Sequence, residues 1–163
     1  MQKENFATKE ARAELAEAII AADLGQYHLV ASKGVQEGDP DGETSVTPAW
    51  RNTVAHLVTG WNVTPLPNAL DWAVGAVAAG INANYLRKIT PNSGSYWNET
   101  DRYEPNWETS FWGEENFAKL KAIKDKYDPN RVFQVWNGVG GLRPETKSTE
   151  KFSTSFIPTL FLN

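Results

Sequence analysis

The sequence of 163 residues contains no cysteine and only two histidines, and both shortages limit its chemistry. Without cysteine, the chain has no disulfide, no thiolate nucleophile and no thiolate-bound metal. His28 and His56 have no third ligand at a suitable spacing, so they do not predict a metal site. Residues 39–43 begin like a calcium loop, but Trp50 occupies the twelfth position, where a bidentate glutamate is needed. We therefore expect a solvated turn there and no bound metal.

Two further features are missing: an excess of positive charge and a long apolar run. The chain has 16 Lys and Arg against 20 Asp and Glu, which gives a net charge of −4 and a pI near 5.2. This balance disfavours nucleic acid and anionic lipid as partners. No segment has the length and apolarity of a membrane span, so we expect no membrane partner. Residues 1–15 lack the apolar core of a signal peptide, which predicts a cytoplasmic location.

What is present favours a folded domain followed by a tail. Hydrophobic residues make up 40% of the chain and aromatic residues 12%, enough to form a core. The composition changes after Gly141, where a polar stretch precedes the apolar residues 155–163. We predict a domain over residues 1–141, and a polar linker with an apolar tail over residues 142–163. The apolar end is expected to dock on the sheet face or across a homodimer interface.

Apolar residues at helical spacing predict three helices. The first covers residues 8–23 with Thr8 as its N-cap, the second begins at Asn68, and the third begins near Gly113. The third ends at the sequence Asp-Pro-Asn over residues 128–130, because proline does not continue a helix. The stripes expected to be buried are Ala11, Leu15, Ile19 and Ala22; Leu70, Val74, Val77 and Ile81; and Phe117, Leu120, Ile123 and Tyr127.

Alternating apolar and polar residues predict strands over residues 27–35 and 51–62, with a short candidate at 132–136. In the second strand, His56 lies on the opposite face from Ala55 and Leu57. Helices and strands in this order indicate an α+β fold, with an antiparallel sheet and helices packed on one face.

The segment from Ser95 to Phe133 carries the most specific pattern in the chain. It and the residue before it contain Gly-Ser-Tyr-Trp-Asn-Glu-Thr-Asp, Glu-Pro-Asn-Trp, Phe-Trp-Gly and Ile-Lys-Asp-Lys-Tyr-Asp-Pro-Asn-Arg-Val-Phe, and Ser-Val-Thr-Pro-Ala-Trp-Arg lies upstream. In order and spacing, these motifs resemble the C-terminal end of berberine-bridge-enzyme-like, FAD-linked oxidoreductases, especially the fungal ones. The resemblance extends over about the first 140 residues, with a boundary good to a few residues. It implies only the last portion of such an oxidase.

The resemblance implies roles for several residues. In that family an antiparallel sheet forms the floor of the substrate domain and lies over the flavin ring. Tyr96 and Asn98 would then lie beside the isoalloxazine, where the amide can hydrogen-bond the ring and the phenol can relay a proton. The residues alone equally allow Tyr96 to pack in the core and Asn98 to cap a turn.

The histidines and several aromatic residues complete the predicted site. His28 and His56 fall on two predicted strands, and we assign them as catalytic candidates together with Tyr96, on the expectation that the strands are neighbours, although a strand histidine is more often structural. The predicted substrate contacts are Trp50, Trp61, Trp97 and Glu99.

The sequence lacks the parts that hold FAD in the resembling family. The pyrophosphate-cradling glycine segment and the His or Cys flavin attachment points lie N-terminal to everything matched here. We therefore expect no cofactor on the isolated chain, and FAD only with a flavin-binding partner.

Three functions remain open from the sequence. In the first, the chain is the substrate-binding part of an FAD-linked oxidoreductase acting on a small organic substrate of secondary metabolism. Alternatively, it is a flavin-independent cyclase or isomerase derived from such an oxidase, or a non-catalytic small-molecule-binding module. The well-kept motif at Tyr96 favours the first.

Overall fold

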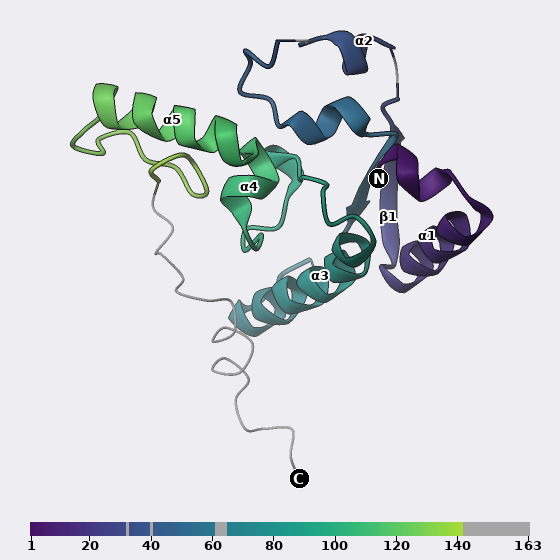
Figure 1. The fold of residues 1–163 in the computed structure, drawn as a ribbon. Helices are drawn as coiled ribbons and strands as arrows, with labels where there is room; N and C mark the ends of the chain where they lie inside the picture. The colour runs from purple at the N-terminus through teal and green to yellow at the C-terminus, as the bar shows by residue number, and fades with distance from the viewer. Residues whose placement is uncertain (32, 40, 61–64, 142–163) are drawn as a thin grey trace.

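The computed structural model describes residues 1–31, 33–39, 41–60 and 65–141 (Figure 1). Trp61 and residues 142–163 lie outside these ranges, and so do the predictions made for them. The regular elements are α1 (Lys9–Ala21), β1 (Leu24–Leu29), α2 (Lys33–Glu37), β2 (Ala55–Thr59), α3 (Ala69–Ile89), α4 (Trp107–Trp112) and α5 (Glu114–Tyr127). Short 3-10 turns at Lys3–Phe6, Pro48–Asn52 and Trp97–Glu99 join them. The α+β class is confirmed.

β1 and β2 form a two-stranded antiparallel sheet in which His28 lies opposite His56. Both strands are shorter than predicted. β1 ends at Leu29 because α2 follows, and β2 begins only at Ala55 because the residues before it form the 3-10 turn Pro48–Asn52. The sheet therefore positions the two histidines on adjacent strands.

The predicted strand at residues 132–136 is wrong. The Asp128 carboxylate accepts hydrogen bonds from the backbone N–H groups of Val132 and Phe133, at 2.7 and 3.1 Å. Both donors that a strand would present to a neighbour are thus used by a local side chain. The segment runs as an irregular, exposed loop after α5.

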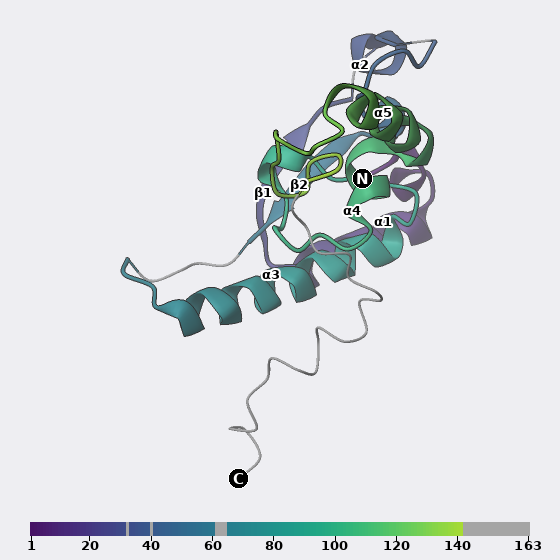
Figure 2. The ribbon, with the colours of Figure 1, turned by 90° about the vertical axis from the view of Figure 1, so that its left-hand side faces the viewer.

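The core lies between α1, α3 and β2. Its buried members are Met1, Leu15, Ala18, Ala22, Ala55 and Leu86. Thr8 caps α1 as predicted, since its hydroxyl oxygen accepts from the N–H of Ala11 at 3.1 Å. Figure 2 shows α3 running along one side of the sheet with α1 nearby, so helices cover one side as expected.

α3 begins as the sequence predicts, but its apolar stripe is not buried. Asn68 accepts from the N–H groups of Leu70 and Asp71, and Asp71 bonds back to the Asn68 N–H at 2.9 Å, which completes a capping box. The four stripe residues are nevertheless 47–64% exposed. The N-terminal half of α3 projects beyond the other elements (Figure 2), so no other described element covers its apolar face. Burial on α3 falls instead on Gly75 and Leu86.

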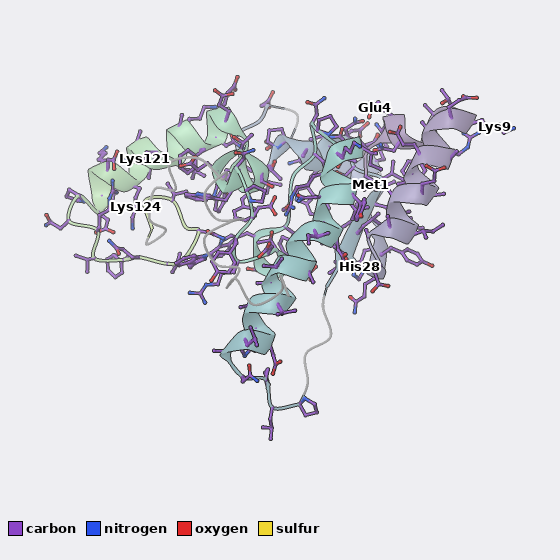
Figure 3. The ribbon with its side chains drawn as sticks, turned by 90° about the horizontal axis from the view of Figure 1, so that it is seen from below. Met1, Glu4, Lys9, His28, Lys121 and Lys124 are labelled. Carbon is purple, nitrogen blue, oxygen red and sulfur yellow. The ribbon has the colours of Figure 1, made fainter. Side chains whose placement is uncertain are left out.

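α5 also begins and ends as predicted, at Gly113 and Asp128, while its stripe is only partly covered. Phe117 and Leu120 are half-buried, whereas Ile123 and Tyr127 are exposed. α5 packs mainly on α4, where the ring of Trp107 meets that of Phe117 edge to face at 5.5 Å. Lys121 and Lys124 in Figure 3 mark this unit at the opposite end of the molecule from Lys9 on α1.

Candidate functional site

A cleft of about 550 Å³ lies between β2, α3 and the segments on either side of Tyr96. Its walls come from β2, the C-terminal half of α3, the 3-10 turn Pro48–Asn52 and residues 93–110. Trp50, His56, Tyr96 and Glu99 are among the lining residues. The walls combine apolar side chains with many polar and charged ones, and the volume is sufficient for a small organic molecule.

Three aromatic rings meet edge to face in this cleft. The His56 ring centroid lies 5.7 Å from that of Trp50 and 6.1 Å from that of Tyr96, and the Trp50 and Tyr96 rings are 6.4 Å apart. Edge-to-face contacts at these distances favour one mutual arrangement of the rings. The sheet, the turn before β2 and the Tyr96 segment are thereby joined at a single point.

His28 lies behind this group. The antiparallel register pairs it with His56, and the two ring centroids are 6.0 Å apart. His28 is exposed on β1, near the α1 side of the molecule (Figure 3), and it is not among the residues that line the cleft. The structure thus places His56 in the cleft and His28 against it from outside.

Trp50 owes its place to the 3-10 turn before β2. Pro48 opens this turn with a fixed φ, and the N–H of Trp50 bonds to the carbonyl of Thr47 at 3.2 Å. The Thr53 hydroxyl then closes the turn on the carbonyl of Ala49 at 2.7 Å. These local bonds hold the half-buried indole beside the start of β2.

Tyr96 and Asn98 are linked directly, because the Asn98 amide donates to the Tyr96 hydroxyl at 3.1 Å. Tyr96 is 40% exposed, and its ring faces the cleft through its contacts with Trp50 and His56. Asn98 borders a separate, shallower hollow together with Trp97. The Trp97 ring packs near Trp112 at 6.4 Å, so it lies outside the main cleft.

Electrostatics in the cleft favour a neutral His56. Burial lowers the pKa of His56 from its ordinary value, and a positive charge on His28 would lower it further. The Glu99 carboxylate, 3.8 Å from His56 Nδ1, partly opposes this and raises the pKa. A neutral imidazole can accept a proton or a hydrogen bond from a ligand.

Glu104 and Arg87 also line the cleft, and sequence reasoning did not select them. Glu104 is 3% exposed and forms an ion pair with Arg87. The sequence signal that could have identified Glu104 is its place in the motif Glu-Pro-Asn-Trp, which we read only as part of the family resemblance. A carboxylate inside an aromatic, turn-forming segment is expected to have a buried partner.

Other site classes find no support in the described ranges. Across residues 1–31, 33–39, 41–60 and 65–141, no three His, Asp or Glu side chains gather to hold a metal ion. None of the helices in those ranges combines the length and apolarity needed to cross a bilayer. Asp39 accepts bonds from Glu43 N–H and from both the N–H and the hydroxyl of Thr44, and it forms an ion pair with Arg51, so its carboxylate is engaged by protein donors.

Comparison with known sequences identifies relatives. Residues 95–140 match the family model for berberine and berberine-like proteins. The FAD-linked oxidoreductase ZEB1 of Gibberella zeae is 38% identical over 127 residues, which cover 74% of this chain and 20% of that protein. The bifunctional decalin synthase calF of Penicillium decumbens is 37% identical over 103 residues, which cover 59% of this chain and 17% of that protein. The chain therefore spans about a fifth of the length of these relatives.

A solved structure shares the fold. The VAO-type flavoprotein MtVAO713 from Myceliophthora thermophila C1 superposes with a TM-score of 0.76 at 25% sequence identity. The match covers 86% of this chain and 25% of that flavoprotein. The described fold thus corresponds to one part of a larger flavoprotein chain.

Proposed function

Because the chain is related to the berberine-bridge-enzyme-like FAD-linked oxidoreductases, we propose that it forms the substrate-side part of such an oxidoreductase. The proposed substrate is a small organic molecule of the secondary-metabolite type, and the flavin is held by a flavin-binding domain, either on a partner polypeptide or within a larger product that includes this chain. The observation that carries the proposal is the meeting of Trp50, His56 and Tyr96 in one cleft. Residues 1–141 are the proposed functional domain, and residues 142–163 its linker and tail.

The residues present fit only one portion of FAD. Tyr96 and Asn98 offer a hydroxyl, an amide and an aromatic face, which suit the edge of an isoalloxazine. A pyrophosphate instead needs a glycine-rich turn whose N–H groups converge at a helix N-terminus. Gly113 at the start of α5 does not supply one. A Cβ placed at Gly113 would lie only 2.9 Å from the Pro48 ring, so the ring occupies the space that a phosphate would need. The fit supports a flavin ring beside Tyr96, at the edge of the cleft, and its phosphates elsewhere.

When bound, the flavin would accept the electrons of the oxidation, and this chain would supply the proton chemistry. His56, neutral because of burial, can take a proton from a substrate hydroxyl or acidic C–H. The Tyr96 hydroxyl oxygen accepts a hydrogen bond from the Asn98 amide, so the hydroxyl hydrogen of Tyr96 can be donated toward the cleft. Trp50 would hold the apolar part of a substrate, and Glu99 would steady the His56 imidazolium once it forms.

The exposed face of α3 supports a partner polypeptide. Val74, Val77, Ile81 and Tyr85 present large apolar side chains to solvent along one side of the helix. Contiguous apolar surface of this kind marks interaction sites. Since the matched relatives are about five times as long as the aligned segment, we assign this face to the flavin-binding domain, with a second copy of this chain as the competing occupant.

A chimera tests the proposal. Residues 1–141 would replace the matched segment of the Gibberella zeae relative, and turnover of that enzyme's own substrate would be followed. Tyr96→Phe in the chimera should lower kcat by at least tenfold with little change in KM, because the hydroxyl acts in the reaction and not in binding. Tyr127→Phe is the matched control, since Tyr127 is 74% exposed and outside the cleft. Equal effects of the two substitutions would contradict the proposal.

A second candidate is a flavin-independent cyclase or isomerase. It is favoured by the similarity to a bifunctional decalin synthase, whose name records ring-forming chemistry. The same cleft would then fold a flexible substrate against Trp50, with His56 and Tyr96 moving protons. Turnover of a polyene substrate by the purified chain without added flavin, lost in His56→Gln, would favour this alternative.

A further inference from the structure

Two carboxylates are buried within the described part of the chain, Glu104 and Asp128. Asp128 ends α5, where it bonds to Lys124 and to two backbone N–H groups. Glu104 lies elsewhere, in the wall of the cleft, and it ends no helix. Burying a charge is costly unless it is paired and hydrogen-bonded, so the partners of Glu104 indicate what it holds in place.

The Glu104 carboxylate joins three separate segments. Arg87 from α3 pairs with it through Nη2 to Oε2 and through Nε to Oε1, the latter at 3.4 Å. The Ser110 hydroxyl from α4 donates to Oε1 at 2.8 Å, and the Ser95 hydroxyl donates to the same oxygen at 3.2 Å. One side chain thus connects α3, α4 and the residue immediately before Tyr96.

The Ser95 contact is reinforced by the backbone. The N–H of Ser95 donates to the carbonyl of Ser110 at 2.9 Å. The chain approaches α4 so closely here that a Cβ added to Gly94 would lie 2.6 Å from that carbonyl oxygen. The backbone entering Tyr96 is therefore held against α4 by this backbone bond together with the side-chain contacts that Glu104 makes to Ser95 and Ser110.

Tyr96 has few other restraints. The described contacts of its side chain are the rings of Trp50 and His56 and the amide of Asn98, which is itself exposed and two residues away. Edge-to-face contacts between partly exposed rings are weak individually. The position of the Tyr96 ring thus depends on where the backbone at Ser95 is held.

We propose that Glu104 is a positioning residue: it holds Tyr96 in the cleft beside His56 and Trp50 by fixing Ser95 to α4 and α3. Its importance for catalysis rests on the function proposed above, whereas its effect on the position of Tyr96 does not. The test therefore uses neither flavin nor substrate, and its outcome is independent of the proposed oxidoreductase activity.

The experiment is ¹⁹F NMR on the full chain labelled with 3-fluorotyrosine, which gives one resonance for each of the five tyrosines. Tyr96→Phe identifies the Tyr96 signal by its loss. Glu104→Gln keeps the size of the side chain but removes the charge that binds Arg87 and both serines. The Tyr96 signal should move toward the position of free fluorotyrosine or broaden, because the ring leaves its neighbours.

Asp128→Asn is the matched control, because it also neutralises a buried, ion-paired carboxylate but lies outside the cleft. Both substitutions are expected to lower the melting temperature, and only Glu104→Gln should move the Tyr96 signal. An unchanged Tyr96 signal in folded Glu104→Gln would overturn the proposal.

Ser95→Ala provides the test if Glu104→Gln does not fold. It removes one contact of the Glu104 carboxylate and leaves the Arg87 pair intact. The Tyr96 signal should shift in the same direction by a smaller amount, and restoring the hydroxyl with Ser95→Thr should return most of that shift. No shift in Ser95→Ala, or an equal shift in Asp128→Asn, would also overturn the proposal.

Discussion

His56 is the residue on which the electrostatics of the cleft converge. Its pKa is lowered chiefly by burial, raised by Glu99 and lowered by His28. The folded chain therefore favours the neutral imidazole more strongly than the unfolded chain does. The sign of this difference fixes how the residue links pH to stability and to proton transfer.

The first prediction concerns stability at mildly acidic pH. Since the pKa of folded His56 lies below its unfolded value of about 6.5, the unfolded chain takes up a proton first as pH falls. Stability is full above about pH 6.5 and is lost as pH falls through the pKa of folded His56. His56→Gln should flatten this loss in urea unfolding between about pH 7.5 and 5.5, a window above the ordinary carboxylate range. His28→Gln should retain most of this loss of stability. Equal flattening in both variants would contradict its assignment to His56.

The second prediction separates the effect of Glu99. Because its carboxylate raises the pKa of His56 from 3.8 Å, Glu99→Gln should lower that pKa further. The two histidines give two imidazole signals in a ¹H–¹³C NMR titration, and His56→Gln assigns them. Glu115→Gln on α5 is the control and should leave the titration unchanged. A pKa that rises in Glu99→Gln would exclude the ion pair.

At the scale of elements, α3 shows which properties the sequence determines. Its start was predictable because the Asn68 capping box depends only on neighbouring residues. Its buried face was not, because periodicity identifies an apolar stripe without identifying what covers it. The stripe from Leu70 to Ile81 faces solvent, and the helix contacts α1 and β2 through its C-terminal part.

The third prediction compares two positions on α3. Leu86 is buried in the core, so Leu86→Ala should lower the free energy of unfolding by about 2–5 kcal/mol. Val77 belongs to the exposed stripe, so Val77→Ala should change it by less than about 0.5 kcal/mol. Urea unfolding of both variants measures the difference. A large loss for Val77→Ala would show that the stripe is covered in solution.

The fourth prediction concerns the contact between the Tyr96 segment and α4. Gly94→Ala would place a methyl group 2.6 Å from the Ser110 carbonyl oxygen, a backbone atom that cannot move aside cheaply. We expect a loss of about 1–3 kcal/mol in unfolding free energy, as for other overpacked sites. Gly60→Ala is the control, because among the described residues no atom other than those of its chain neighbours lies within 4 Å of its Cβ position. Comparable losses in the two variants would contradict this packing.

For the whole molecule, features that depend on neighbouring residues were easier to predict from the sequence than features that depend on long-range contacts. The pairing of His28 with His56 followed from two strands of the right character, and Tyr96 lies beside them. The Arg87–Glu104 pair was not predictable, because its partners are 17 residues apart on different elements. The irregular course of residues 132–136 was also missed, since it depends on the Asp128 side chain capturing their N–H groups.

At the scale of the whole molecule, the fold matches one quarter of a flavoprotein chain. The cleft offers an aromatic wall, a neutral histidine and a tyrosine, and the sequence contains no glycine-rich pyrophosphate cradle. On the proposed function, the chain acts on a substrate beside a flavin that a flavin-binding domain holds. The exposed face of α3 is the surface assigned to that domain.

The most direct test is a titration of this chain into the flavin-binding part of the Gibberella zeae relative, ended before the matched segment and loaded with FAD. We expect a saturable change in the flavin absorbance spectrum, weakened by Tyr96→Ala and unaffected by Tyr127→Ala. We also expect the chain alone to leave gel filtration colourless after incubation with FAD. A flavin spectrum that stays with the isolated chain, or no spectral change at saturating chain, would contradict the central claim.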